Sequence, residues 1–133
     1  MEYKVFLIED VESTRSLMRL LLGETSYRVV GEAGTLVSAL ERLAVTPVDI
    51  VILDLQMPDG NGIDLVPKIR EMYPDAVIVV ASAHNDAGSV QSALQVGAQG
   101  YLIKPFTPKG LESTLARALR RAGLRLPEPH STH

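Results

Sequence analysis

Val51-Ile52-Leu53-Asp54 is an aliphatic run that ends on an acid, and two other apolar runs are likewise followed by charged residues. Val5-Phe6-Leu7-Ile8 leads into Glu9-Asp10, and Gly100-Tyr101-Leu102-Ile103 leads into Lys104-Pro105. Short aliphatic and β-branched runs are typical of strands buried on both faces. If these strands lie parallel in one sheet, their carboxyl ends share the edge where open α/β sheets bind ligands. The sequence therefore predicts a site of three carboxylates and one ammonium.

The bulk composition limits the classes of function. The chain has 133 residues, 46% of them hydrophobic, which suits one domain. Its net charge of −3 gives no basic field, so we expect no direct nucleic-acid binding by this segment. The absence of cysteine excludes disulfides and thiolate chemistry and is compatible with a cytoplasmic location. The first residues form no signal peptide, and no apolar stretch nears the ~18 residues of a membrane span, so we expect no membrane partner.

Strand-like and helix-like patterns alternate five times along the chain. The expected strands are 3–9, 27–33, 49–54, 76–82 and 100–104. The expected helices are 13–22, 35–44, 63 or 64 to 73, 85 or 86 to 96, and 108–123. Their expected N-caps include Ser13, Thr35, Asn85 or Asp86, and Thr107. Pro67 is tolerable only in the first turn of the third helix.

This alternation predicts an α/β fold with a parallel sheet, right-handed crossovers and helices on both faces. The third and fourth strands are the most continuously apolar and should be central. The second strand carries Arg28 and Glu32 and should lie at an edge. We therefore predict a five-stranded parallel sheet of order 2-1-3-4-5, which is the flavodoxin-like order. This order creates a switch point between the first and third strands, where ligands bind.

The charges at the switch point favour a divalent cation. Glu9, Asp10 and Asp54 carry three negative charges, and Lys104 returns one positive charge. Like charges ~4 Å apart repel by roughly 4 kcal/mol per pair at an effective dielectric constant near 20. Carboxylate oxygens favour Mg²⁺, with Mn²⁺ as an alternative. Such a site suits phosphoryl chemistry with Asp54 as a candidate covalent acceptor.

Five segments together resemble a known family. They are Glu9-Asp10, residues 54–62 (Asp-Leu-Gln-Met-Pro-Asp-Gly-Asn-Gly), Ser82-Ala83, Gly97-Ala98, and residues 100–106 (Gly-Tyr-Leu-Ile-Lys-Pro-Phe). In this order, and at these strand ends, they resemble the receiver domain of a two-component response regulator. The resemblance covers residues 3–123. We accordingly expect a phosphoacceptor receiver domain at 1–123, and a flexible tail or the start of an interdomain linker at 124–133.

The resemblance implies a role for each acid. Asp54 would accept a phosphoryl group from a phosphohistidine on a sensor histidine kinase. Asp10 and Asp54 would ligate Mg²⁺ directly, together with the backbone carbonyl of Gln56. Glu9 would act largely through a metal-bound water. The domain would catalyse only its own phosphorylation and dephosphorylation, so it is not expected to be an enzyme with an external substrate.

The resemblance also implies a switch. Lys104 would contact the phosphoryl oxygens, and its bond to Pro105 would be cis. Ser82 would donate its hydroxyl to the phosphoryl group, and Tyr101 would turn inward in response. These movements would bias the face made by the fourth helix, the fifth strand and the fifth helix. We expect control of transcription through an output domain beyond this segment, which would contact DNA, and phosphorylation-dependent self-association through the last two helices.

Three other readings stay open. A Mg²⁺-dependent phosphohydrolase with an aspartyl nucleophile would use the same acids, but such enzymes typically place a second Asp where this chain has Gln56, which cannot act as a general acid. A receiver that is never phosphorylated would serve as a docking module. A mononucleotide binder needs an anion cradle after the first strand, where Glu9 and Asp10 repel phosphate.

Overall fold

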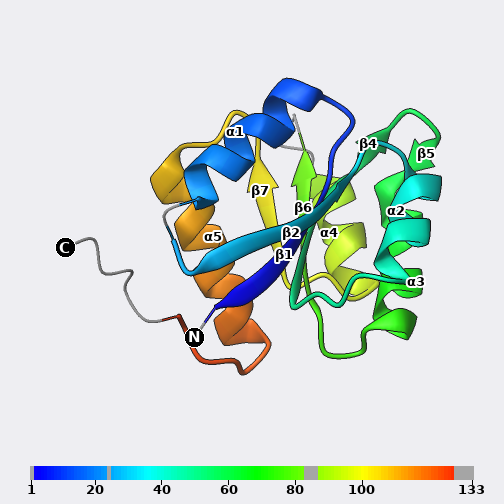
Figure 1. Ribbon diagram of the computed structural model, residues 1–133. Helices are drawn as coiled ribbons and strands as arrows, with labels where there is room; N and C mark the ends of the chain where they lie inside the picture. Colours follow the sequence, from blue (N-terminus) through cyan, green and yellow to red (C-terminus); the bar gives the residue numbers. More distant parts are fainter. Residues whose placement is uncertain (1, 24, 83–86, 128–133) are drawn as a thin grey trace.

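Five parallel strands form the central sheet, in the order β2-β1-β3-β6-β7 (Figure 1). The computed structural model describes residues 2–23, 25–82 and 87–127. The strands are β1 (Tyr3–Ile8), β2 (Tyr27–Ala33), β3 (Ile50–Asp54), β6 (Val77–Ser82) and β7 (Gly100–Ile103). Because β6 and β7 are the fourth and fifth strands of this sheet, the predicted order 2-1-3-4-5 is confirmed.

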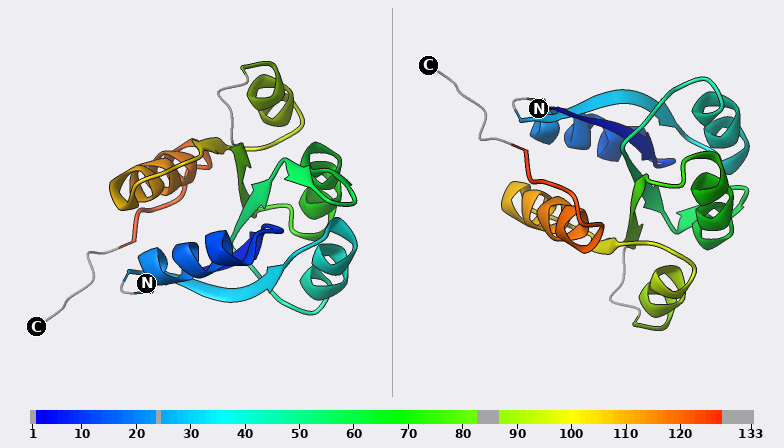
Figure 2. Two further views of the ribbon diagram at one scale, coloured as in Figure 1. Left: turned by 90° about the horizontal axis from the view of Figure 1, so that it is seen from above. Right: turned by 90° about the horizontal axis from the view of Figure 1, so that it is seen from below.

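Helices cover both faces of the sheet, as Figure 2 shows. They are α1 (Glu12–Leu22), α2 (Leu36–Leu43), α3 (Leu65–Met72), α4 (Ala87–Gln95) and α5 (Pro108–Arg121). One hydrophobic core lies between the sheet and the pair α1 and α5. The other core lies between the sheet and α2, α3 and α4. Two separate cores explain why the strands are apolar on both sides.

The central strand shows how the sequence produces this arrangement. All five residues of β3 are buried. Ile50 and Ile52 pack in the core with α1 and α5, whereas Val51 and Leu53 pack in the core on the opposite face. Alternate side chains of a strand point to opposite faces, so a strand between two helix layers needs an unbroken apolar run. Strand β2 lies at an edge of the sheet, as predicted from its Arg28 and Glu32, and most of its residues are only partly buried.

Two of the predicted helix starts are confirmed. The Thr35 hydroxyl accepts a hydrogen bond from the Ser38 main-chain N–H (3.0 Å) and caps α2. Thr107 caps α5 in the same way, with Pro108 in the first turn. Pro67 lies in the first turn of α3, as required, because a short 3₁₀ turn, η1 (Gly62–Asp64), precedes that helix.

The predicted cap at Ser13 is wrong. Helix α1 begins at Glu12, and Val11 occupies the N-cap position without a side-chain hydrogen bond. The main-chain N–H groups of Thr14 and Arg15 both bond to the Val11 carbonyl at 3.1 Å, so Ser13 is already inside the first turn. The alternative caps of the fourth helix, residues 85 and 86, lie outside the described residues.

Two details of the loops were not expected. The turn cluster after β3 contains a small antiparallel hairpin, β4 (Gln56–Met57) with β5 (Gly60–Asn61). After α5, the chain folds back on the domain: the Tyr3 hydroxyl donates to the Arg125 carbonyl, and Leu126 packs against the core of α1 and α5. The predicted boundary at residue 123 stays a prediction. Within the described residues, no helix combines the length and apolar character needed to cross a membrane.

Candidate functional site

The structure brings the three predicted acids together at the carboxyl edge of the sheet. Glu9 and Asp10 follow β1, and Asp54 ends β3, its neighbour in the sheet. One carboxylate oxygen from each lies within 4.8 Å of the others. Glu9 and Asp54 are only 1% and 5% exposed, whereas Asp10 is exposed. The convergence that we predicted from parallel strand ends is therefore present at the switch point between the two strands.

Lys104 joins two of these acids. Its Nζ donates to Asp54 Oδ2 at 2.6 Å and to Glu9 Oε1. The lysine follows β7, and its peptide bond to Pro105 is cis. Burial alone lowers the pKa of Lys104, but the hydrogen bonds to the two carboxylates outweigh burial and raise it. Lys104 is thus held as a cation between two buried carboxylates.

Glu9 is the most constrained residue of the site. Its main-chain N–H donates to the Ala33 carbonyl at 3.0 Å, and its Oε2 accepts from the Val11 N–H at 3.1 Å. Its main-chain carbonyl accepts from Arg15 Nη1 at 2.5 Å. Burial raises the pKa of Glu9, although the bonds from Lys104 and Val11 act in the opposite direction. Glu9 thus enters the site with its main chain and its carboxylate both anchored.

The loop after β3 is fitted closely to Asp54. The Gln56 main-chain N–H donates to Asp54 Oδ1 at 2.9 Å, so each Asp54 oxygen has a donor. The Gln56 side chain is exposed. Gly62 lies directly against the backbone of the acid, because a Cβ at this position would be 2.3 Å from the Asp54 carbonyl oxygen. Only glycine allows this approach.

Asp59 has a structural partner that the sequence did not reveal. Its two carboxylate oxygens accept from the Leu36 N–H (2.8 Å) and the Val37 N–H (3.1 Å) at the start of α2. These main-chain hydrogen bonds lower the pKa of Asp59. The loop after Asp54 is therefore attached to the neighbouring helix.

The two predicted switch residues lie on adjacent strands. Ser82 ends β6, is buried, and pairs with Ile103 of β7. Its carbonyl accepts from the Lys104 N–H at 2.8 Å, which ties it to the lysine through the main chain. Tyr101 pairs with Val80, two positions before Ser82, and is 42% exposed. The inward turn of Tyr101 stays a prediction.

The residues present fit a hard divalent cation. The donors are carboxylate oxygens, with the Gln56 carbonyl in the adjacent β4, and among the residues that the structure describes no sulfur or imidazole ligand belongs to the cluster. After pairing with Lys104, the acids keep two net negative charges. Mg²⁺ prefers oxygen ligands and usually binds one or two carboxylates together with waters and phosphate oxygens. The cluster therefore has the composition of a magnesium site.

The family model of the response regulator receiver domain matches residues 5–116. The chain belongs to this family. The family and the fold that the sequence motifs implied are therefore both confirmed. The receiver domain is a signalling domain.

Curated relatives include whole regulators and single-domain proteins. The receiver domain is 36% identical over 121 residues to the DNA-binding transcriptional activator DevR/DosR of Mycobacterium tuberculosis, covering 90% of this chain and 54% of that protein. The chain thus spans about half the length of that relative. It is 32% identical over 112 residues to the chemotaxis protein CheY of Thermotoga maritima, covering 84% of this chain and 93% of CheY.

A solved receiver structure is also similar to this chain in fold and sequence. The beryllofluoride-activated NtrC4 receiver domain dimer, determined in solution, has a TM-score of 0.81 and 29% sequence identity to this chain. The match covers 90% of this chain and 98% of that one. The arrangement of strands and helices in the receiver domain is therefore that of a known receiver.

Proposed function

We propose that the receiver domain accepts a phosphoryl group on Asp54 in a reaction that depends on Mg²⁺, with Mn²⁺ as a substitute. The observation that carries the proposal is the position of Asp54: a buried acid within 4.8 Å of two others and bonded to Lys104 at 2.6 Å. Asp10, Asp54 and the Gln56 carbonyl would hold the cation, and Glu9 would act through a bound water. When bound, the cation supplies positive charge that offsets the carboxylates and the incoming phosphoryl oxygens.

The donor in this proposal is a phosphohistidine of a sensor histidine kinase. One Asp54 carboxylate oxygen forms a bond to phosphorus while the phosphorus–nitrogen bond breaks. The bonding electrons leave with the imidazole nitrogen, which takes a proton from water. The product is an acyl phosphate on Asp54 and a neutral histidine.

Lys104 and Ser82 would respond to the new group. Phosphorylation adds about −1.5 to −2 charges and new acceptor oxygens. Lys104, now bonded to two carboxylates, would gain phosphoryl oxygens as partners, and the Ser82 hydroxyl would donate to them. The hydrogen bond between the Lys104 N–H and the Ser82 carbonyl couples the two residues, so a shift at one moves β7 and, with it, Tyr101.

Intact-mass analysis tests the proposal directly. Acetyl phosphate with Mg²⁺ should add one phosphoryl group to the wild-type chain and none to Asp54→Asn. Asp64→Asn is the matched control, because Asp64 is an exposed acid without a capping hydrogen bond. An absent adduct, or the same adduct in Asp54→Asn, contradicts the proposal and favours a docking module. Continuous release of phosphate from a phosphomonoester favours a phosphohydrolase.

We further propose that the phosphorylated domain self-associates through α4 and α5 and controls transcription through a DNA-binding output domain. The support is similarity to the NtrC4 receiver dimer and to DevR/DosR. Sedimentation with and without beryllofluoride tests self-association. Identical profiles would contradict it.

A further inference from the structure

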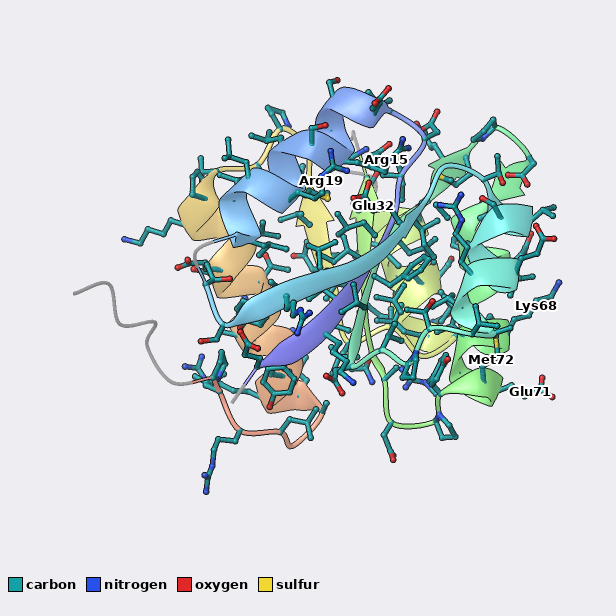
Figure 3. All side chains as sticks on the ribbon, in the orientation of Figure 1. Arg15, Arg19, Glu32, Lys68, Glu71 and Met72 are labelled. Carbon is teal, nitrogen blue, oxygen red and sulfur yellow. The ribbon has the colours of Figure 1, made fainter. Side chains whose placement is uncertain are left out.

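A cluster of two arginines and one glutamate lies beside the acids, and no part of the proposed chemistry uses it. Arg15 and Arg19 lie on α1, and Glu32 lies on β2; Figure 3 shows the three side chains close together between the two elements. Arg15 Nε lies 3.2 Å from Glu32 Oε1, and Arg19 Nη1 bonds to both Glu32 oxygens. Only Arg15 among the three also bonds to the segment Glu9-Asp10-Val11 between β1 and α1, here called the acid turn, through the Glu9 carbonyl at 2.5 Å.

We propose that Arg15 is a positioning residue for the metal-binding acids and that it acts through the main chain of Glu9. The inference rests on the proposed function. Glu32 orients the guanidinium, and the guanidinium holds the carbonyl of the peptide that joins Glu9 to Asp10. The Glu9 N–H is fixed on the other side by the Ala33 carbonyl at 3.0 Å. The Glu32 carboxylate and the Ala33 carbonyl both belong to β2. That strand therefore holds the acid turn at two points, once through Arg15 and once directly.

The planar guanidinium suits this role better than an ammonium. Arg15 uses different nitrogens for its two partners, so Glu32 and the Glu9 carbonyl together define its orientation. A lysine keeps the charge but presents a single donor group on a flexible stem. The side chain of Arg15 is 19% exposed and that of Arg19 is 44% exposed, so Arg15 is the more enclosed of the pair.

The role is testable because the charge of Arg15 and its hold on the acid turn have opposite effects on Mg²⁺ affinity. Removing a nearby positive charge should strengthen Mg²⁺ binding, because repulsion decreases. Loosening the acid turn should weaken it, because the carboxylates must then be ordered on binding. A charge-assisted hydrogen bond of this kind corresponds to roughly a tenfold change in an equilibrium constant.

The experiment compares Arg15→Lys and Arg15→Met with Arg19→Met in the 133-residue chain. Arg19→Met removes the same charge from the same glutamate without touching the Glu9 carbonyl. Two quantities are measured by NMR: Mg²⁺ affinity by titration with the metal alone, and amide exchange at Val11 without metal. Val11 reports on the turn because its N–H bonds to Glu9 Oε2.

We expect both Arg15 variants to weaken Mg²⁺ binding by about tenfold and to accelerate Val11 exchange by a similar factor, with Arg19→Met within about twofold of wild type. Wild-type values in Arg15→Lys would overturn the proposal. Equal effects in Arg19→Met, or a looser turn with unchanged affinity, would overturn it as well. If the wild-type chain binds no Mg²⁺, the proposed function fails, and the exchange data alone decide whether Arg15 holds the turn.

Discussion

Replacing Lys104 by methionine removes the ammonium that joins Glu9 and Asp54 but keeps a side chain of similar length. Both acids are almost fully buried, and the Lys104 side chain is 18% exposed. Removing one partner of a buried ion pair costs about 3 to 5 kcal/mol, because the remaining charge is left uncompensated. Since the lysine is partly exposed, we expect the lower end, about 3 kcal/mol at pH 7 without metal. For a domain of this size, that is a decrease in Tm of about 10 °C.

The loss should depend on pH in a defined direction. The pKa of Glu9 is already raised above 4.5, and removal of Lys104 raises it further, because the lysine hydrogen bond acts to lower it. A carboxyl whose folded-state pKa is raised contributes stability that is present below the unfolded value and is lost as the pH rises through the folded value. The variant should therefore approach wild-type stability near pH 4 and fall away from it toward pH 7.

Magnesium should narrow the difference at pH 7. Without Lys104, the cation no longer competes with an ammonium for the carboxylates, so the variant should bind it more tightly. Because Mg²⁺ also stabilises the wild type, the difference at saturating Mg²⁺ should narrow by about 1.4 kcal/mol for each tenfold gain in affinity of the variant over the wild type. Lys68→Met is the matched control, since Lys68 is exposed on α3 (Figure 3).

Urea unfolding of both variants and the wild type, with EDTA and with Mg²⁺, measures these differences. A loss of less than about 0.5 kcal/mol for Lys104→Met at pH 7 in EDTA would refute this prediction, because ordinary surface substitutions cost that much. An equal loss near pH 4 would refute it as well, since the cost would then not arise from buried carboxylate charge.

Three further predictions concern the loops and the edge strand. Gly62→Ala places a Cβ 2.3 Å from the Asp54 carbonyl oxygen, so we expect about 1 to 3 kcal/mol of destabilisation in urea and slower phosphorylation by acetyl phosphate; wild-type values for both would contradict this. Asp59→Ala should accelerate amide exchange at the start of α2. In the wild type, the protection factors of the same amides should decrease as the pH falls below 3.8 through the lowered pKa of Asp59, and protection factors that do not change with pH would argue against this cap. Gly31→Ala crowds the buried ring of Phe6 at 2.6 Å and should lower the urea midpoint by the equivalent of about 1 to 3 kcal/mol with an unchanged m-value; a changed m-value would indicate a different cause.

The strand ends were predictable because their signals are local. An apolar run such as Ile50–Leu53 shows both that a strand is present and that both of its faces are buried. Polar residues in β2 place that strand at an edge, and the edge position leaves one sheet order that creates a switch point. The convergence of Glu9, Asp54 and Lys104 then follows from the parallel arrangement, since the carboxyl ends of all strands lie at one edge.

The starts of short elements were less predictable. Ser13 in the second helical position looks like a cap, yet α1 begins one residue earlier at Glu12, and the N-cap residue Val11 makes no side-chain hydrogen bond. The hairpin of β4 and β5 has two residues in each strand, too few to show a period of two. Where an element carries no repeat, its type depends on the contacts of the surrounding fold.

The partners of the acids were the least predictable part, and the reason is geometric. Arg15 and Arg19 both lie on α1 and both bond to Glu32, so their spacing along the helix does not distinguish them. The register of β2 against β1 pairs Leu7 with Glu32, which places the glutamate partner of Arg15 beside the end of β1, and this register depends on the sheet rather than on the helix sequence. The hydrogen bonds from Asp59 to the start of α2 likewise depend on the hairpin in the loop after Asp54. The motif residues therefore determine which groups meet, whereas residues outside the acid cluster determine how firmly the loops that carry those groups are held.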